Sequence, residues 1–292
     1  MWNCPICNSE KDTLLCPNCG FDESKDYRNH RSFGALSEIS GKVFKIEESA
    51  DNILMKSIYT GYIFGKRMRR KQIKKVYFQN HKSKIGANAW DVSEKQDGSV
   101  LAWTEDAGDG MLELYIAADG KIKANKDCSD LFNGYTNLEE IFGLEFFKTD
   151  QAETMEHMFY ECKKLSSLDL SDFDTSHVTN MRNMFSFCEK LEKLDLSGFD
   201  TSRVTNMQRM FIFCRNLQSL DVSHFDTSQV TDMKDMFAGC NSLKTLDVSQ
   251  FDTGSVTNMS ASLAKYLYIP REVDAGIKTE EQGGFFHKLW KK

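Results

Sequence analysis

Four cysteines near the N-terminus have the spacing of a tetrahedral metal site. They form a C-x2-C-x8-C-x2-C pattern, made by Cys4, Cys7, Cys16 and Cys19. Each pair lies on a tight turn that presents two thiolates to one ion, and four thiolates suit Zn²⁺. An iron–sulfur site and a redox pair are the alternatives, and the two matched pairs favour zinc. Because the site has four protein ligands and no open position, the predicted Zn²⁺ is structural and supports the folding of a short segment.

The other five of the nine cysteines do not form evident disulfide pairs, which favours a reducing compartment. Four of them recur every 26 residues: Cys162, Cys188, Cys214 and Cys240. A metal or disulfide ladder is one interpretation, but small buried residues at a bend are favoured because free cysteine packs well. The chain has no apolar run of about 18 residues and no recognisable leader. The expected location is therefore cytoplasmic, with the cell surface as the alternative.

A basic run lies between residues 66 and 75. Seven of its ten residues are cationic: Lys66, Arg67, Arg69, Arg70, Lys71, Lys74 and Lys75. Such a run can contact phosphates or an anionic membrane surface. The favoured alternative is a short solvated helix leading into a strand over residues 75–78, since Met68 and Ile73 are interspersed as apolar anchors.

A column of carboxylates is a further candidate for partner binding. Its members, at 26-residue intervals, are Asp169, Asp195, Asp221 and Asp247, each followed two positions later by Ser171, Ser197, Ser223 or Ser249. Each Asp lies between two apolar residues, so it should point outward. Like charges about 5 Å apart repel by roughly 1 kcal/mol in water, so hydrogen bonds from serine, a cation or a basic partner must offset the cost. A hydrogen-bonded Asp/Ser ladder is the favoured interpretation, and an acidic face for a basic ligand is the alternative.

Catalytic chemistry finds little support in the sequence. The six histidines neither recur with the repeat nor take a catalytic spacing, and phosphate-loop and nucleophile motifs are absent. The prediction is a non-enzymatic protein without a small-molecule substrate.

The elements that must position these columns come from a 26-residue repeat. It runs from Ala152 to about Met259, and a degenerate copy begins near Asn125. In the copy that starts at Val178, three buried-type residues fall at i, i+3 and i+4, which predicts a short helix after an N-cap at Thr179. The alternation of residues 194–196 predicts a short strand. One helix and one strand per unit predict an α/β repeat, a leucine-rich-repeat-like solenoid with a parallel sheet.

The repeat unit VTNMxxMFxxCxxLxxLDLSxFDTS resembles the BspA-type leucine-rich repeats of bacterial surface proteins. The resemblance covers about half of the chain. It implies adhesion and protein or matrix binding, and it brings no catalytic residues. The cysteine quartet is similar to the short zinc ribbons that begin many bacterial multidomain proteins.

The sequence thus predicts an N-terminal zinc ribbon, a small β N-terminal cap and a repeat solenoid. The expected boundaries are 1–22 for the ribbon, 23–36 for a linker, 37–124 for a mixed α/β lead-in and capping region, 125–260 for the solenoid and 261–292 for a C-terminal cap and tail. The predicted function is a non-enzymatic scaffold that presents a solenoid face to a protein partner. Nucleic-acid or anionic-membrane binding through residues 66–75 and a surface adhesin are the alternatives.

Overall fold

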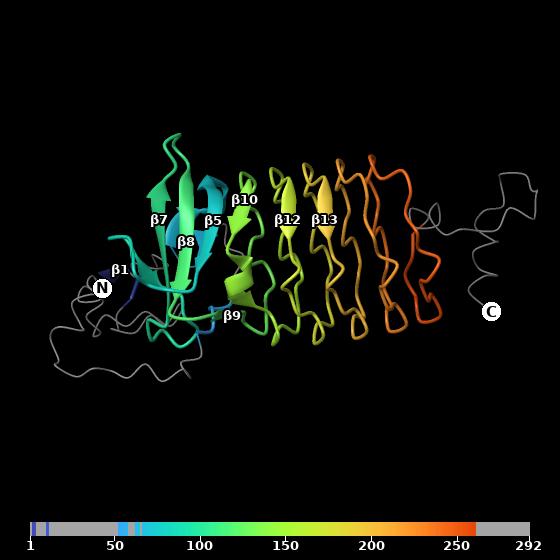
Figure 1. The fold of residues 1–292 in the computed structure, drawn as a ribbon, viewed down its shortest axis with the longest axis horizontal. Helices are drawn as coiled ribbons and strands as arrows, with labels where there is room; N and C mark the ends of the chain where they lie inside the picture. The colour runs from blue at the N-terminus through green and yellow to red at the C-terminus, as the bar shows by residue number, and fades with distance from the viewer. Residues whose placement is uncertain (1, 4–9, 12–51, 58–61, 65, 261–292) are drawn as a thin grey trace, which may run out of the picture.

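A row of coils stacked on the end of a β-sheet makes up the molecule (Figure 1). This computed structural model describes residues 2–3, 10–11, 52–57, 62–64 and 66–260. The sheet lies at the N-terminal end, and the 26-residue units follow it side by side. One hydrophobic core runs from Leu54 in the lead-in to Val256 in the last coil. Within the described ranges, no helical segment has the length and apolarity to cross a bilayer.

The sheet has five strands in the order β10-β5-β8-β7-β6. Their bounds are Ile73–Gln79 (β5), Trp90–Asp91 (β6), Val100–Asp106 (β7), Leu112–Ala118 (β8) and Glu140–Phe142 (β10). Strands β6, β7 and β8 pair antiparallel, whereas β5 runs parallel to both β8 and β10. The sheet is therefore mixed, and β10 is the strand through which it meets the first coil.

Short pairs and turns complete the lead-in. Antiparallel pairs join β1 (Trp2–Asn3) to β2 (Glu10–Lys11) and β3 (Tyr62–Ile63) to β4 (Lys66–Arg69), and β9 (Ile122–Lys123) runs parallel to β11 (Phe147–Lys148). Single 3₁₀ turns are η2 (Arg70–Gln72) and η3 (Leu144–Phe146). The basic run therefore forms β4, η2 and the start of β5 rather than the expected solvated helix.

The coils are joined mainly by turn-rich backbone rather than by a wide sheet. Strands β12 (Ser167–Asp169) and β13 (Lys193–Asp195) pair in parallel, with Leu168 opposite Leu194. A second, single-residue line of parallel bridges passes from coil to coil through Asp127, Thr154, Asn180, Asn206, Asp232 and Asn258. The 26-residue period thus places equivalent residues beside one another in successive coils.

The segment predicted as a helix in each unit is a series of tight turns. In the unit from Val178, alternate N–H groups donate to a carbonyl three residues back within the coil, from Met184, Ser186 and Cys188. The intervening N–H groups donate to the next coil, from Asn183, Phe185 and Phe187. An α-helix would commit every N–H group to its own carbonyls four residues back. The turns instead leave half of the N–H groups free to hold the stack together.

Columns of identical side chains fill the core of the stack. Rings of successive coils lie face to face, with centroids 5.3–5.6 Å apart, in the column Phe132, Phe159, Phe185, Phe211 and Phe237. The methionines of the same units are fully buried beside them. Parallel rings at this spacing retain ring contact while excluding water from the whole column.

The predicted α/β leucine-rich-repeat-like solenoid is therefore wrong. The described residues contain no α-helix, and among the repeat units only β12 and β13 form strand, so no continuous parallel sheet lines the coils. A five-stranded mixed sheet takes the place of the expected small β cap. The predicted zinc ribbon lies outside the described residues, apart from the two-residue strands β1 and β2.

Candidate functional site

A ladder of polar side chains runs along the edge of the stack formed by the tight turns. Its members occupy the same turn position in successive coils: Asp130, His157, Asn183, Arg209 and Asp235. All five have left-handed backbone, with φ between 54 and 61°. Tight turns of this kind need a positive φ at their third position. We call these five residues the polar ladder.

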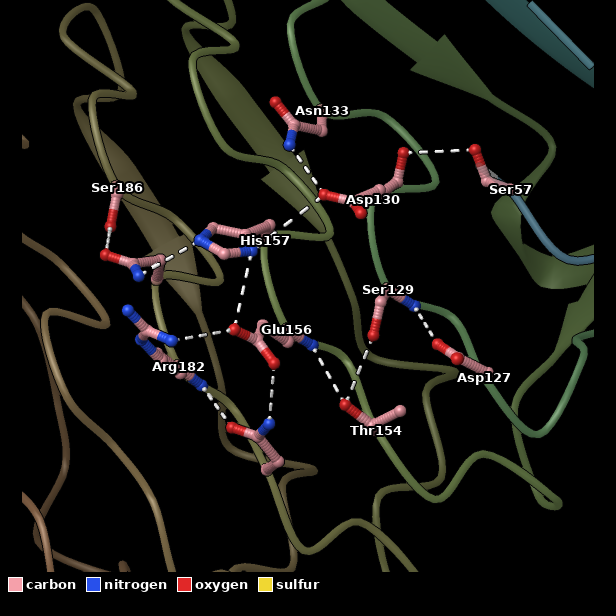
Figure 2. Close-up of polar contacts among 12 residues, drawn as sticks. Ser57, Asp127, Ser129, Asp130, Asn133, Thr154, Glu156, His157, Arg182 and Ser186 are labelled. Carbon is pink, nitrogen blue, oxygen red and sulfur yellow. Dashed lines mark hydrogen bonds and ion pairs between the residues drawn. The ribbon is translucent and has the colours of Figure 1, made fainter. Parts of the chain in front are cut away.

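His157 is the second member of the polar ladder and lies among charged side chains (Figure 2). Its Nδ1 lies 3.6 Å from Oε1 of Glu156 and 3.9 Å from Oδ1 of Asp130. Its Nε2 lies 3.1 Å from Nδ2 of Asn183. Burial lowers the pKa of His157, the two carboxylates oppose that effect, and the nearby Arg182 adds to it. The imidazole is therefore favoured in its neutral form.

The ladder continues beyond His157 through neutral and charged groups. The buried Ser186 Oγ lies 3.0 Å from Oδ1 of Asn183 and 2.6 Å from the carbonyl oxygen of Arg209. In turn, Nε of Arg209 lies 3.4 Å from Oδ2 of Asp235. Ser186 reaches His157 only through Asn183, so the two do not form the direct hydrogen bond that a nucleophile and its base require. The arrangement suits positioning and recognition.

Two polar atoms beside the ladder have no hydrogen-bond partner among the described residues. They are Oδ1 of Asn133 and Nε of Arg182. The Asn133 amide nitrogen donates to Oδ1 of Asp130 at 2.6 Å, and Arg182 Nη1 lies 3.2 Å from Oε1 of Glu156. Each terminal group therefore uses one nitrogen in a polar contact and has a second, buried atom without a hydrogen-bond partner among the described residues.

Partly exposed aromatic rings lie four residues further along the turn edge. Phe187 and Phe213 have φ of 61 and 59°, a left-handed conformation that costs a bulky residue about 1–2 kcal/mol. Their centroids lie 5.0 Å apart, and Tyr160 in the preceding coil lies 5.5 Å from Phe187. The Arg215 guanidinium lies 4.9 Å from the centroid of Phe213. We call Tyr160, Phe187 and Phe213 the aromatic strip.

The predicted Asp/Ser column lies on the exposed part of each coil. One carboxylate oxygen of each Asp accepts a hydrogen bond from the backbone N–H of the serine two residues later, at 2.9–3.0 Å, in the pairs Asp169–Ser171, Asp195–Ser197, Asp221–Ser223 and Asp247–Ser249. Hydrogen bonds from these serines lower the pKa of each carboxyl group. The backbone N–H is the largest cause at Asp169, Asp195 and Asp247, and the Ser223 hydroxyl is the largest at Asp221. The pairing lies within a coil rather than between coils, and the charged groups remain exposed.

A second Asp column, made by Asp174, Asp200, Asp226 and Asp252, lies in tight turns. One oxygen of Asp200 accepts a hydrogen bond from the N–H of Ser202 at 2.9 Å. Beside it, the buried Thr175 hydroxyl donates to the carbonyl of Asp200 at 2.8 Å and accepts from its N–H at 2.9 Å. Thr201 and Thr227 donate to the following coil in the same way. These threonines join neighbouring coils from inside.

The cysteine column packs, as its favoured interpretation predicts. Each of Cys162, Cys188, Cys214 and Cys240 is a buried thiol with its Sγ 3.0–3.2 Å from a phenylalanine carbonyl oxygen of an earlier coil. Burial raises the pKa of the Cys162, Cys188 and Cys214 thiols. A protonated, enclosed thiol is unreactive.

The basic run does not form one patch. Arg70 is only 2% exposed, and its guanidinium donates to the carbonyls of Asp130 and Asn133 and to Oγ of Ser57. The guanidinium carbon of Arg70 lies 5.5 Å from the ring centroid of Tyr135. Arg70 therefore joins the lead-in to the first coil.

Three lysines of the run have partners in the five-stranded sheet or its loops. Lys74 Nζ lies 2.7 Å from Oδ2 of Asp109, and Lys75 Nζ lies 3.4 Å from Oε2 of Glu140. Lys66 Nζ lies 5.2 Å from the ring centroid of Trp90. Arg69 and Lys71 are exposed, and the side chain of Arg67 lies outside the described residues. The predicted basic patch is thus divided between structural and exposed positions.

The predicted zinc ligands Cys4, Cys7, Cys16 and Cys19 also lie outside the described residues. In the part of the chain that the structure describes, no group of three or more His, Cys, Asp or Glu side chains could hold a metal ion.

The turn edge was not anticipated from the sequence. The polar ladder combines five positions of four residue types, so no repeated letter marks it. A signal exists in the aromatic strip, because Gly134 and Gly239 occupy the same turn position as Phe187 and Phe213. The full column reads Gly134, Glu161, Phe187, Phe213 and Gly239. Glycine in some of its units indicates a left-handed position at which the other units retain a larger side chain.

Comparison with known proteins adds a family likeness. A family model described as "Mycoplasma protein of unknown function, DUF285" matches residues 126–220 and again 213–267. The matched ranges cover the coils and overlap, in keeping with a tandem repeat. No curated protein and no solved structure matches the chain.

Proposed function

We propose that this protein is a non-enzymatic scaffold that binds a protein partner along its stack of coils. The observation that carries the proposal is the exposed Asp/Ser column. Each of its four carboxylates uses one oxygen to accept a serine N–H. The column therefore holds negative charge at fixed positions on a rigid surface, which favours a basic partner. The resemblance to BspA-type repeats, with their protein- and matrix-binding roles, supports the same proposal.

The test uses charge-neutral variants that keep the turn. Asn retains an oxygen that can accept the serine N–H, so Asp195→Asn/Asp221→Asn removes charge without removing that bond. We expect the double variant to capture at least about tenfold less partner from an extract of the native cell. This corresponds to a loss of about 1.4 kcal/mol or more in binding free energy. The measurement is affinity capture at two salt concentrations, because charge pairing weakens with salt.

Asp200→Asn/Asp226→Asn is the matched control. It makes the same change in net charge at the second Asp column and preserves the equivalent bonds from Ser202 and Ser228. Equal retention by wild type and both double variants would contradict binding through the Asp/Ser column.

A further inference from the structure

Charge is unevenly divided between the turn edge and the rest of the coils. The turn segments are residues 156–164, 182–190, 208–216 and 234–242, and they contain seven Lys/Arg against four Asp/Glu. The other residues between Ala152 and Ser255 contain three Lys/Arg against twelve Asp/Glu. The stack is therefore acidic overall and cationic along one edge.

The aromatic strip lies on that cationic edge. Phe187 and Phe213 keep left-handed backbone although Gly134 and Gly239 fill the same position elsewhere. Their rings remain partly exposed, whereas the phenylalanine column of the core is fully buried. Bulky residues held in such a conformation and only partly buried are typical of sites where strain serves function.

Gly239 fits the ring of Phe213 closely. A Cβ atom at Gly239 would lie 2.3 Å from Cδ1 of Phe213, so the absence of a side chain there leaves room for the ring. Arg215 lies against the Phe213 ring, and its side chain is exposed. Ring edges and the Arg215 cation are therefore presented together along the turn edge.

We propose that the aromatic strip is a docking surface for an acidic peptide segment that carries aromatic or aliphatic side chains. Apolar side chains of the peptide pack against Phe187 and Phe213, and its carboxylates face the cations of the turn edge, with Arg215 the nearest. Charge complementarity selects an acidic segment over a basic one. This surface is separate from the Asp/Ser column and would bind a ligand of opposite charge.

The test begins with a phage-displayed library of random 12-residue peptides selected on the full-length protein. Selected peptides are synthesised with a fluorophore and titrated by anisotropy. We expect enrichment of peptides that combine Asp or Glu with Phe, Trp or Leu. Binding should weaken at least tenfold in Phe187→Gly/Phe213→Gly. Glycine suits this position, because Gly134 and Gly239 occupy it in other units. A thermal unfolding midpoint within a few degrees of wild type shows that the variant is folded.

Two further variants keep the inference falsifiable. Arg215→Glu does not alter a left-handed position and should also weaken the binding of acidic peptides at least tenfold. Asp195→Asn/Asp221→Asn should leave this binding unchanged, which separates the surface from the proposed Asp/Ser site. Selection of basic peptides, selection of none, or equal binding by the Phe187→Gly/Phe213→Gly variant would overturn the inference. Self-association in sedimentation that this variant abolishes would show a second copy as the occupant, and would overturn it too.

Discussion

At the scale of single residues, buried hydrogen-bonding side chains align neighbouring coils. A hydroxyl of Thr175 both donates to and accepts from the backbone of Asp200, one coil further on. The thiol of Cys188 has the carbonyl of Phe159 within 3.2 Å. Apolar packing is non-directional, whereas these bonds have a defined geometry. They therefore fix the register between coils that the core columns by themselves would leave less well defined.

Replacement of Thr175 by Val tests this role, because valine keeps the shape and removes the hydroxyl. It leaves the N–H and the carbonyl of Asp200 without their partner, so we expect a loss of about 1–3 kcal/mol in the free energy of unfolding. Urea denaturation followed by circular dichroism measures it. Thr179→Val is the matched control, since Thr179 donates to Glu153 from an exposed position and should cost less than about 1 kcal/mol. Thr179 also joins two coils, so equal losses would refute the greater contribution expected of the buried hydroxyl.

His157 gives the polar ladder a pH dependence whose sign follows from burial. The pKa of His157 is lowered in the folded protein from its usual 6.5, so the unfolded chain takes up the proton first as pH falls. The contribution of the neutral His157 ring to the free energy of unfolding is therefore complete above about pH 6.5, and it is lost as pH falls through the pKa of the folded state. The facing groups Asp130 and Glu156 moderate this effect, and Arg182 strengthens it.

We expect His157→Gln to flatten the stability profile between pH 7.5 and pH 5, measured by urea denaturation at intervals of half a pH unit. His177→Gln is the control because His177 is exposed on the neighbouring part of the stack. A wild-type profile that rises as pH falls through this window would contradict a lowered pKa for His157.

At the scale of elements, the sequence pattern predicted which side chains are buried but not the backbone that buries them. Met181, Met184 and Phe185 are fully buried, as their spacing indicates. An interval of three or four residues fits successive three-residue turns as well as a helix, and local propensity does not separate the two. Inter-coil hydrogen bonds favour the turns over a helix, because they require N–H groups that a helix would use internally. Such bonds depend on a neighbouring coil 26 residues away, which no local window contains.

Left-handed residues explain why the turn edge was missed. His157, Asn183 and Arg209 adopt positive φ without being glycine, and the enrichment of asparagine and histidine in that conformation is too weak to mark the position in a sequence. The Asp/Ser pairs could be predicted, because an Asp side chain commonly accepts a hydrogen bond from the backbone N–H two residues later and so forms a local turn. Features set by two or three adjacent residues were therefore accessible, and features set by stacking were not.

The junction between the sheet and the first coil gives a test at this scale. Gly143 has φ of 77°, and a Cβ there would lie 2.1 Å from the carbonyl oxygen of Phe78. Gly143→Ala should therefore cost the left-handed penalty of about 1–2 kcal/mol and a further overpacking term of about 1–3 kcal/mol. Gly110→Ala is the matched control, with φ of 78° and no atom within 4 Å of the new Cβ. Gly110→Ala should show the left-handed penalty alone. Equal losses in thermal denaturation would refute the close approach at Gly143.

At the scale of the whole molecule, one core and one buried cation unite the lead-in with the stack. The hydrophobic core is continuous from Leu54 to Val256. At the junction, Phe78 of β5 lies edge-on to Phe132 of the first coil, with centroids 6.3 Å apart. The sheet therefore covers the open N-terminal end of the coils, where a stack would otherwise expose its core. Length and charge alone could not predict that Arg70, in a run of cations, is the residue buried there.

Arg70→Lys tests whether the junction makes the sheet and coils unfold together. Lysine keeps the charge but cannot donate at once to the carbonyls of Asp130 and Asn133 and to Ser57 as the guanidinium does. We expect a loss of at least about 3 kcal/mol, because buried acceptors and an ammonium group lose partners. In differential scanning calorimetry the wild type should show one transition and the variant two, since the coils can then unfold separately. Arg69→Lys, at an exposed neighbouring position, should leave a single transition. A single, equally cooperative transition in Arg70→Lys would show that apolar contacts such as Phe78 against Phe132 suffice to couple the two parts.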